Sequence, residues 1–119
     1  MTRSVSNQHV GKWGEDTVAA YLAARGYEIV VRNVRTPYGE IDIVTKQGDM
    51  TIFVEVKTLR SSRNFFPEQN VTARKQAHML ACAEHYAMKN DIDHWQIDVV
   101  AVEGKIGLEP KITHFENAI

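Results

Sequence analysis

The stretch GEIDIVTKQGDMTIFVEVK places charged residues inside two runs of β-branched and aromatic residues. Each run alternates in the manner of a β-strand, and the residues between them, 47–49, are typical of a turn, so the stretch predicts a β-hairpin. Asp42, Glu55 and Lys57 would lie within these strands, where a buried charge without a partner is costly. The hairpin face that carries them is therefore either exposed to solvent or part of a chemical site.

A register set by the turn brings Asp42 beside Glu55, and alternation puts Lys57 on the same face as Glu55. Two neighbouring carboxylates raise each other's pKa unless a cation lies between them. Oxygen ligands from two acids suit Mg²⁺ or Mn²⁺. The lysine is suited to contact a phosphate or to position and activate a water molecule. Metal and lysine together supply what phosphodiester hydrolysis requires: a Lewis acid, a nucleophile and stabilisation of negative charge.

A plainer interpretation of these three residues is a solvated sheet face with a cross-strand ion pair, which contributes under about 1 kcal/mol. We favour the chemical site, because Asp42 and Glu55 are like charges that would repel each other on an ordinary sheet face.

Apolar residues recur at spacings of three and four from Asn7 to Arg25 and predict a helix that ends at Gly26. Glu15 falls at the edge of its apolar face, whereas Asp16 points well away from it. We therefore add Glu15 to the candidate site. The alternative is a surface carboxylate near the helix N-terminal half.

The remaining pattern predicts strands and one more helix. The predicted strands are 27–31, 40–46, 50–57 and 95–102, with a short one at 111–115; 59–71 is a loop and 72–89 a helix. This order of elements is typical of an α/β sandwich, a mixed sheet flanked by helices. We expect helix 72–89 to join strands 50–57 and 95–102 in a right-handed parallel connection.

The composition is that of one ordinary domain spanning residues 1–119, with 44% hydrophobic and 24% charged residues. No apolar run approaches the roughly 18 residues of a membrane span, and the N-terminus lacks the apolar stretch of a signal peptide. We therefore expect a cytoplasmic protein without membrane contact. The single cysteine, Cys82, excludes an internal disulfide and a Cys-rich zinc site.

The net charge of -1 argues against coating nucleic acid by bulk attraction. The distribution is uneven: residues up to Lys75 include eleven Lys or Arg and eight Asp or Glu, and a bound metal would leave that part more basic still. His78 and His85 share the predicted solvent face of the second helix. Phosphate contacts are expected from Arg32, Arg35, Arg60, Arg63, Arg74, Lys75 and Gln76. Gln76 could equally satisfy a buried backbone group.

Asp42 is followed thirteen positions later by Glu55, Val56 and Lys57. This spacing resembles the PD-(D/E)XK nuclease core found in restriction endonucleases and archaeal Holliday-junction resolvases; that superfamily often has Pro before the Asp, where this chain has Ile41. The surrounding motifs are GKWGED (11–16), GYEI (26–29), RN (32–33), GEID (39–42), FVEVK (53–57), RKQ (74–76), DVV (98–100) and HFENA (114–118). Taken in order, they resemble the bacterial YraN family of small endonuclease-like proteins.

The resemblance implies a restriction-endonuclease-like sandwich with a metal-dependent nuclease site formed by Glu15, Asp42, Glu55 and Lys57. In our hypothesis Asp42 and Glu55 hold Mg²⁺ or Mn²⁺, the Val56 carbonyl completes the shell, and Glu15 binds through water or a second metal. The substrate would be DNA, with branched DNA the leading candidate. A resolvase must cut two strands symmetrically, so that analogy predicts a homodimer.

The chain departs from the family pattern at one position: where we expect an Arg directly after Lys57 and Thr58, it has Leu59 and then Arg60, so the pattern assigns no role to Arg60. A shared fold is weak evidence for a shared reaction, which keeps a second interpretation open. The alternative is a nucleic-acid-binding or partner-binding module of the same fold with little or no turnover.

Overall fold

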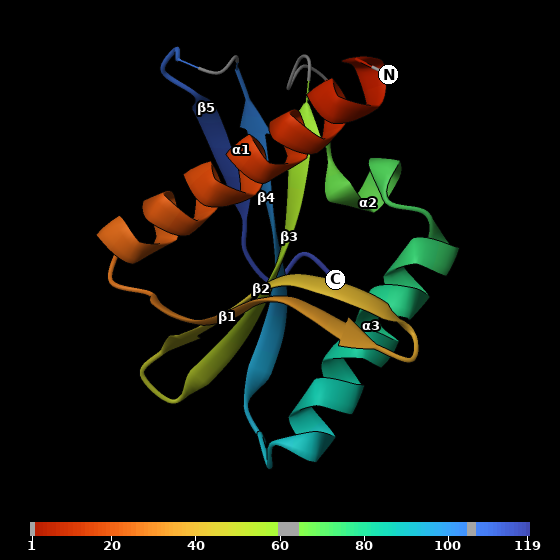
Figure 1. Cartoon of the computed structure of the whole chain (residues 1–119). Helices are drawn as coiled ribbons and strands as arrows, with labels where there is room; N and C mark the ends of the chain where they lie inside the picture. The colour runs from red at the N-terminus through yellow and green to blue at the C-terminus, as the bar shows by residue number, and fades with distance from the viewer. Residues whose placement is uncertain (1, 60–64, 105–106) are drawn as a thin grey trace.

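The computed structural model describes residues 2–59, 65–104 and 107–119 (Figure 1). Its elements are α1 (Thr2–Ala24), β1 (Glu28–Thr36), β2 (Gly39–Gln47), β3 (Met50–Leu59), α2 (Pro67–Asn70), α3 (Ala73–Lys89), β4 (Trp95–Glu103) and β5 (Lys111–Phe115). The first helix begins earlier than its apolar pattern predicts, β1 runs five residues beyond its predicted end, and the short α2 was not foreseen. Within the described residues, no helix has both the length and the apolar character needed to cross a membrane.

The five strands form one mixed sheet in the order β1-β2-β3-β4-β5. Neighbouring strands are antiparallel except β3 and β4, which are parallel and are joined through α3. Helix α1 packs on one face of the sheet and α3 on the other, on opposite sides of β3 in Figure 1. The predicted α/β sandwich and the predicted parallel connection are both confirmed.

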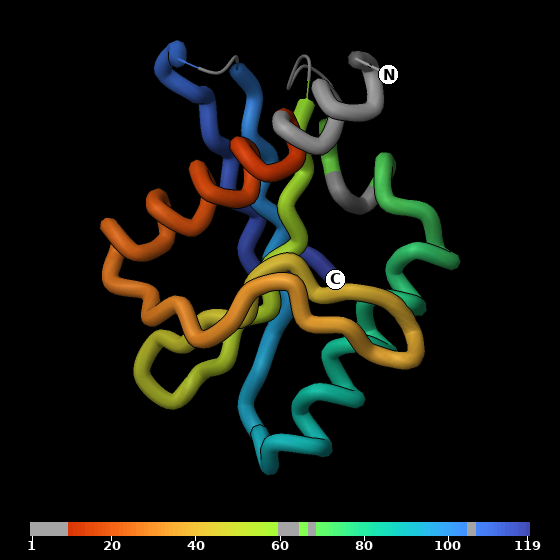
Figure 2. Tube along the Cα trace, viewed as in Figure 1, coloured from red at the N-terminus to blue at the C-terminus, as the bar shows by residue number. Residues whose placement is uncertain are grey.

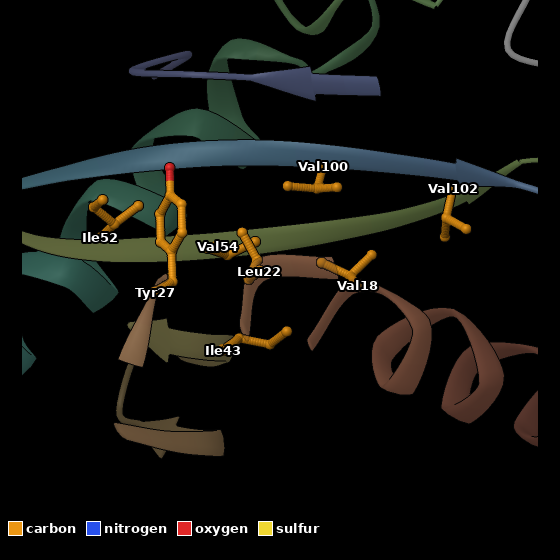
Figure 3. Close-up of a cluster of buried hydrophobic side chains, with 8 residues drawn as sticks. All are labelled: Val18, Leu22, Tyr27, Ile43, Ile52, Val54, Val100 and Val102. Carbon is orange, nitrogen blue, oxygen red and sulfur yellow. The ribbon is translucent and has the colours of Figure 1, made fainter. Parts of the chain in front are cut away.

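Each helix covers its own hydrophobic cluster. The cluster under α1 consists of Val18, Leu22, Tyr27, Ile43, Ile52, Val54, Val100 and Val102 (Figure 3). The cluster under α3 consists of Ile41, Val44, Phe53, Cys82, Ala83 and Ile97. Phe53 is only 2% exposed, so the β3 face that carries Glu55 and Lys57 is also part of a core for half its length. Helix α3, which connects two parallel strands, covers the part of this face around Phe53. Glu55 and Lys57 follow Phe53 along β3 and are less buried than it is.

Strand β2 changes sides along its length. Ile41 packs under α3 and Ile43 under α1, although residues two apart share a face in a flat strand. The β2–β3 register runs from Gln47 opposite Met50 to Ile43 opposite Val54, whereas β2 stays paired with β1 as far as Gly39. The β1–β2 hairpin therefore bends across the line of β3 and β4, as Figure 2 shows. Asp42 lies at this bend.

Helix α1 approaches the sheet closely at Gly14. A Cβ atom there would overlap the Thr58 hydroxyl and lie 3.3 Å from Val102 Cγ1. Because this contact sets the height of α1 above β3 and β4, it also sets the position of Glu15, the next residue along the helix.

We expect Gly14→Ala to lower the free energy of unfolding by about 1–3 kcal/mol, because the added methyl group overpacks this contact. Urea denaturation measures the effect. Adding Thr58→Ala removes the overlapping hydroxyl and should restore most of the loss. Gly11→Ala is the matched control: no atom lies within 4 Å of its new methyl group, so helix propensity makes it neutral or stabilising. Unchanged stability in Gly14→Ala would contradict the close approach.

Candidate active site

Asp42 is anchored where β2 separates from β3. Its Oδ2 atom accepts a hydrogen bond of 2.8 Å from the Val56 backbone N–H. Asp42 lies one residue and Val56 two residues beyond the last β2–β3 pair, Ile43 opposite Val54. The carboxylate thus supplies an acceptor to β3 at the point where the β2 backbone no longer pairs with it. A buried N–H group without a partner would be costly, so this bond gives Asp42 a structural reason to point at β3.

The acids of the two strands share one half-buried environment. Burial and then the charge of Glu55, with smaller effects of Glu15 and Glu40, raise the pKa of Asp42 to about 7, although the hydrogen bond from the Val56 N–H lowers it. Burial also raises the pKa of Glu55, and Lys75 and Lys57 oppose that rise. Asp42 and Glu55 therefore lie within electrostatic reach of each other.

Two ammonium groups approach Glu55, whose side chain is 13% exposed. Lys57 Nζ lies 4.0 Å and Lys75 Nζ 3.8 Å from the same carboxylate oxygen, Oε2. Lys57 comes from β3, whereas Lys75 comes from the first turn of α3, where Thr72 caps the helix by accepting from the Lys75 N–H. The sequence placed Lys75 among the phosphate contacts and did not foresee its pairing with Glu55.

Glu15 lies near this cluster but is already paired. Arg32 donates to Glu15 Oε1 from Nε at 3.2 Å and from Nη2 at 3.1 Å, and Nη2 also donates to Asp16 Oδ1 at 2.6 Å. That last bond holds the pKa of the exposed Asp16 below its usual value. Arg32, which the sequence predicts to contact phosphate, joins α1 to β1 through these bonds. Glu15 still adds to the negative potential that raises the pKa of Asp42.

The other predicted phosphate contacts occupy varied positions. Arg35 is 91% exposed and lies 3.9 Å from Glu40. Arg74 is exposed in the first turn of α3. Arg60 and Arg63 lie outside the described residues.

Gln76 hydrogen-bonds a backbone group, which is one of the two roles that the sequence suggests for it. Its Nε2 donates a 2.9 Å hydrogen bond to the Val71 carbonyl, which precedes α3. This bond fixes the loop that leads into the helix carrying Lys75.

Asp98 forms a separate, fully buried network on the α1 face of the sheet. It accepts 2.8 Å hydrogen bonds from Gln96 Nε2 and the Asn117 N–H, and His114 Nε2 lies 2.7 Å from its Oδ2. The three partners account for its burial. Asp98 therefore ties β4 to β5 and takes no part in the cluster around Asp42 and Glu55.

The donor set can be compared with what a metal ion requires. In residues 2–59, 65–104 and 107–119, no three His, Cys, Asp or Glu side chains converge as a metal cage. Mg²⁺ commonly binds through one or two carboxylates and fills its other positions with water and substrate phosphate. Asp42 and Glu55, whose pKa values burial raises, fit that mode, and Glu15 would first have to part from Arg32.

These features define a class: an α/β domain in which two carboxylates and a lysine meet where two strands of a mixed sheet separate. Residues 14–102 match the model of Uncharacterised protein family UPF0102, and the chain belongs to that family. It is the YraN family that the sequence motifs resemble, so that resemblance is confirmed.

Relatives extend over nearly the whole chain. The UPF0102 protein of Syntrophotalea carbinolica is 43% identical over 111 residues, 92% of this chain and 89% of the relative. That of Trichlorobacter lovleyi is 44% identical over 115 residues, 94% and 91% of the two chains. Among solved structures, Pyrococcus furiosus SfsA in complex with Ca²⁺ matches with a TM-score of 0.46 and 16% identity, over 92% of this chain and 63% of that one.

The raised pKa of Asp42 predicts a pH dependence. A carboxyl group whose pKa is higher in the folded than in the unfolded state favours folding at low pH, and this contribution is lost as pH rises through about 7. Asp42→Asn keeps an acceptor for the Val56 N–H but cannot ionise. It should flatten this dependence and raise the unfolding free energy of the metal-free protein at pH 8 by about 1–3 kcal/mol.

Urea denaturation at pH 5 and pH 8 in EDTA measures both effects, with Asp49→Asn, an exposed acid in the hairpin turn, as the control. Parallel pH profiles for wild type and Asp42→Asn would contradict the raised pKa.

Proposed function

We propose that the protein is a Mg²⁺- or Mn²⁺-dependent endonuclease that hydrolyses DNA phosphodiester bonds. The observation that carries this proposal is the half-buried pair of Asp42 and Glu55, whose negative charges repel each other. Lys57 and Lys75 both approach Glu55. A site with this charge pattern suits a divalent cation on the acids and a phosphate on the lysines.

Each side chain has a role in this reaction. Asp42 and Glu55 would hold the metal, with the Val56 carbonyl as a further ligand; when bound, the metal would supply Lewis acidity and a water molecule of lowered pKa. Lys57 would position the attacking water or stabilise the charge that develops on the phosphate. Lys75 would help to hold the phosphate.

The paired state of Glu15 assigns it a supporting role. With its carboxylate bound to Arg32, Glu15 would act on the site through its charge or through water, rather than as a direct ligand. By holding the Glu15 carboxylate in place, Arg32 would act as a positioning residue.

One observation favours the alternative, a nucleic-acid-binding module without turnover. Glu15 is engaged by Arg32, and the described part of the chain offers no third acid converging on Asp42 and Glu55. A module of this kind would bind DNA with a salt-dependent affinity that does not require the two acids.

Branched DNA is the substrate that the resemblance to resolvases suggests, and symmetric cutting of a junction would call for a homodimer. A labelled panel of four-way junction, flap, single strand and duplex, each with Mg²⁺, Mn²⁺ or EDTA, distinguishes these substrates. Light scattering on the free and junction-bound protein gives the oligomeric state.

We expect wild type to cut at least one member of the panel only with metal, and Glu55→Ala to lower that rate about 100-fold or more, because the metal loses a ligand. Lys57→Ala should lower the rate while leaving metal binding intact. Glu84→Ala, an exposed acid on the outer side of α3, is the matched control and should cut normally. No cutting by folded wild type with either metal, together with unchanged DNA binding by Glu55→Ala, would favour the binding module.

A further inference from the structure

Two hollows lie between α3 and the β1–β2 hairpin, whose end lies beside α3 in Figure 1. The first, of about 110 Å³, is lined by Tyr38, Glu55, Lys75 and His78 among others and therefore opens at the candidate site. The second, of about 230 Å³, is lined by residues that include Arg35, His85 and Lys89 and continues toward the C-terminal end of α3.

Contacts between the hairpin and α3 link residues that line the two hollows, so the hollows are neighbours along α3. The ring of Tyr38, from the first hollow, meets the ring of His85, from the second, edge-on with centroids 6.0 Å apart. Thr36 Oγ1, from the second hollow, donates to Cys82 Sγ, from the first, at 3.2 Å. We refer to the two neighbouring hollows together as the α3 groove, whose lining includes Glu55 in the first hollow and Lys89 in the second.

One wall of the α3 groove is formed by two lysines and two histidines of α3. At about 100° per residue, Lys75, His78, His85 and Lys89 fall within an arc of about 80° on α3, whereas Glu84 lies on the opposite side. All four line the groove. The two histidines, which the sequence assigned to a plain solvent face, therefore belong to this wall.

The hairpin forms the other wall. Arg35 is 91% exposed, and its guanidinium lies 3.9 Å from Glu40, which also lines the groove. Tyr38, which is 54% exposed, offers a ring at the middle of the groove. Cations interleaved with an exposed aromatic ring are the pattern that binds single-stranded nucleic acid.

The length of the groove and its exposed ring favour an unpaired strand. Lys75 and Lys89 are about 21 Å apart along the helix axis, enough for several phosphates of one strand. The exposed ring of Tyr38 can stack on an unpaired base, whereas the bases of a duplex are already stacked on one another.

We propose that the α3 groove binds the backbone of one unpaired DNA strand that leads away from the Asp42 and Glu55 site. Lys75, Lys89 and Arg35 contact its phosphates, and Tyr38 stacks on a base. The proposal rests on the proposed function for the chemistry at the end near Glu55, and it narrows the substrate class to DNA that is unpaired next to the cut.

The test is binding in EDTA, so that cleavage plays no part. Fluorescence anisotropy gives the affinity of labelled single-stranded and blunt duplex DNA over a range of salt concentrations, for wild type, Lys89→Ala, Arg35→Ala and Tyr38→Ala. Lys46→Ala, which removes an exposed lysine that lines neither hollow, is the charge-matched control.

We expect wild type to bind the single strand more tightly than the duplex. Lys89→Ala and Arg35→Ala should each weaken single-strand binding about three- to tenfold and reduce the slope of log affinity against log salt by about 0.7. Tyr38→Ala should weaken it about tenfold, with the salt slope unchanged, because stacking releases no counterions. Lys46→Ala should behave as wild type.

Wild-type affinity and salt slope in both Lys89→Ala and Arg35→Ala would overturn the α3 groove as the strand site, as would a preference for the blunt duplex. The outcome is independent of catalysis. Groove-dependent binding without metal-dependent cutting would contradict the endonuclease alone, whereas cutting with groove-independent binding would contradict the groove alone.

Discussion

The separation of β2 from β3 at Asp42 is the constraint around which the site is built. Past Ile43 the strand bends toward α3, and the hydrogen bond from the Val56 N–H to the Asp42 carboxylate bridges the opening. This places two acids in a half-buried region, where burial raises both pKa values and the charge of Glu55 adds to the rise at Asp42. The hydrophobic clusters on both faces of the sheet supply the stability that tolerates such an arrangement.

Both helices are positioned by the packing that surrounds this opening. The absence of a side chain at Gly14 lets α1 approach β3 and β4, which brings Glu15 near the acids. On the other face, α3 packs on Phe53 and begins two residues before Lys75, so its first turn delivers an ammonium group to Glu55. The sheet supplies Asp42 and Glu55, whereas α1 supplies Glu15 and α3 supplies Lys75 near them.

Much of the fold and of the acid pair could be predicted from the sequence, because local signals determined them. The polar turn between two alternating runs fixes the β2–β3 register as far as Ile43 opposite Val54, and this brings Asp42 close to Glu55 although the two strands separate at that point. Helical periodicity likewise places Glu15 inward and leaves Asp16 exposed. The pairing of Arg32 with Glu15 could not be predicted, since it depends on how α1 crosses β1. The packing of α3 over Phe53 and the bend of β2 between Ile41 and Ile43 arise from tertiary contacts. The alternation of apolar and polar residues along one strand does not predict such contacts.

The network around Asp98 couples the docking of β4 to that of the residues that follow it. Asp98 is fully buried in an interior strand, yet two of its three partners, His114 and Asn117, lie 16 and 19 positions later in the chain. Without those partners, β4 could enter the sheet only by burying a carboxylate short of hydrogen bonds, which is costly. The long-range parallel pairing of β3 with β4 is therefore most favourable once β5 is in place, whereas the local hairpin that carries Asp42 and Glu55 has no such requirement.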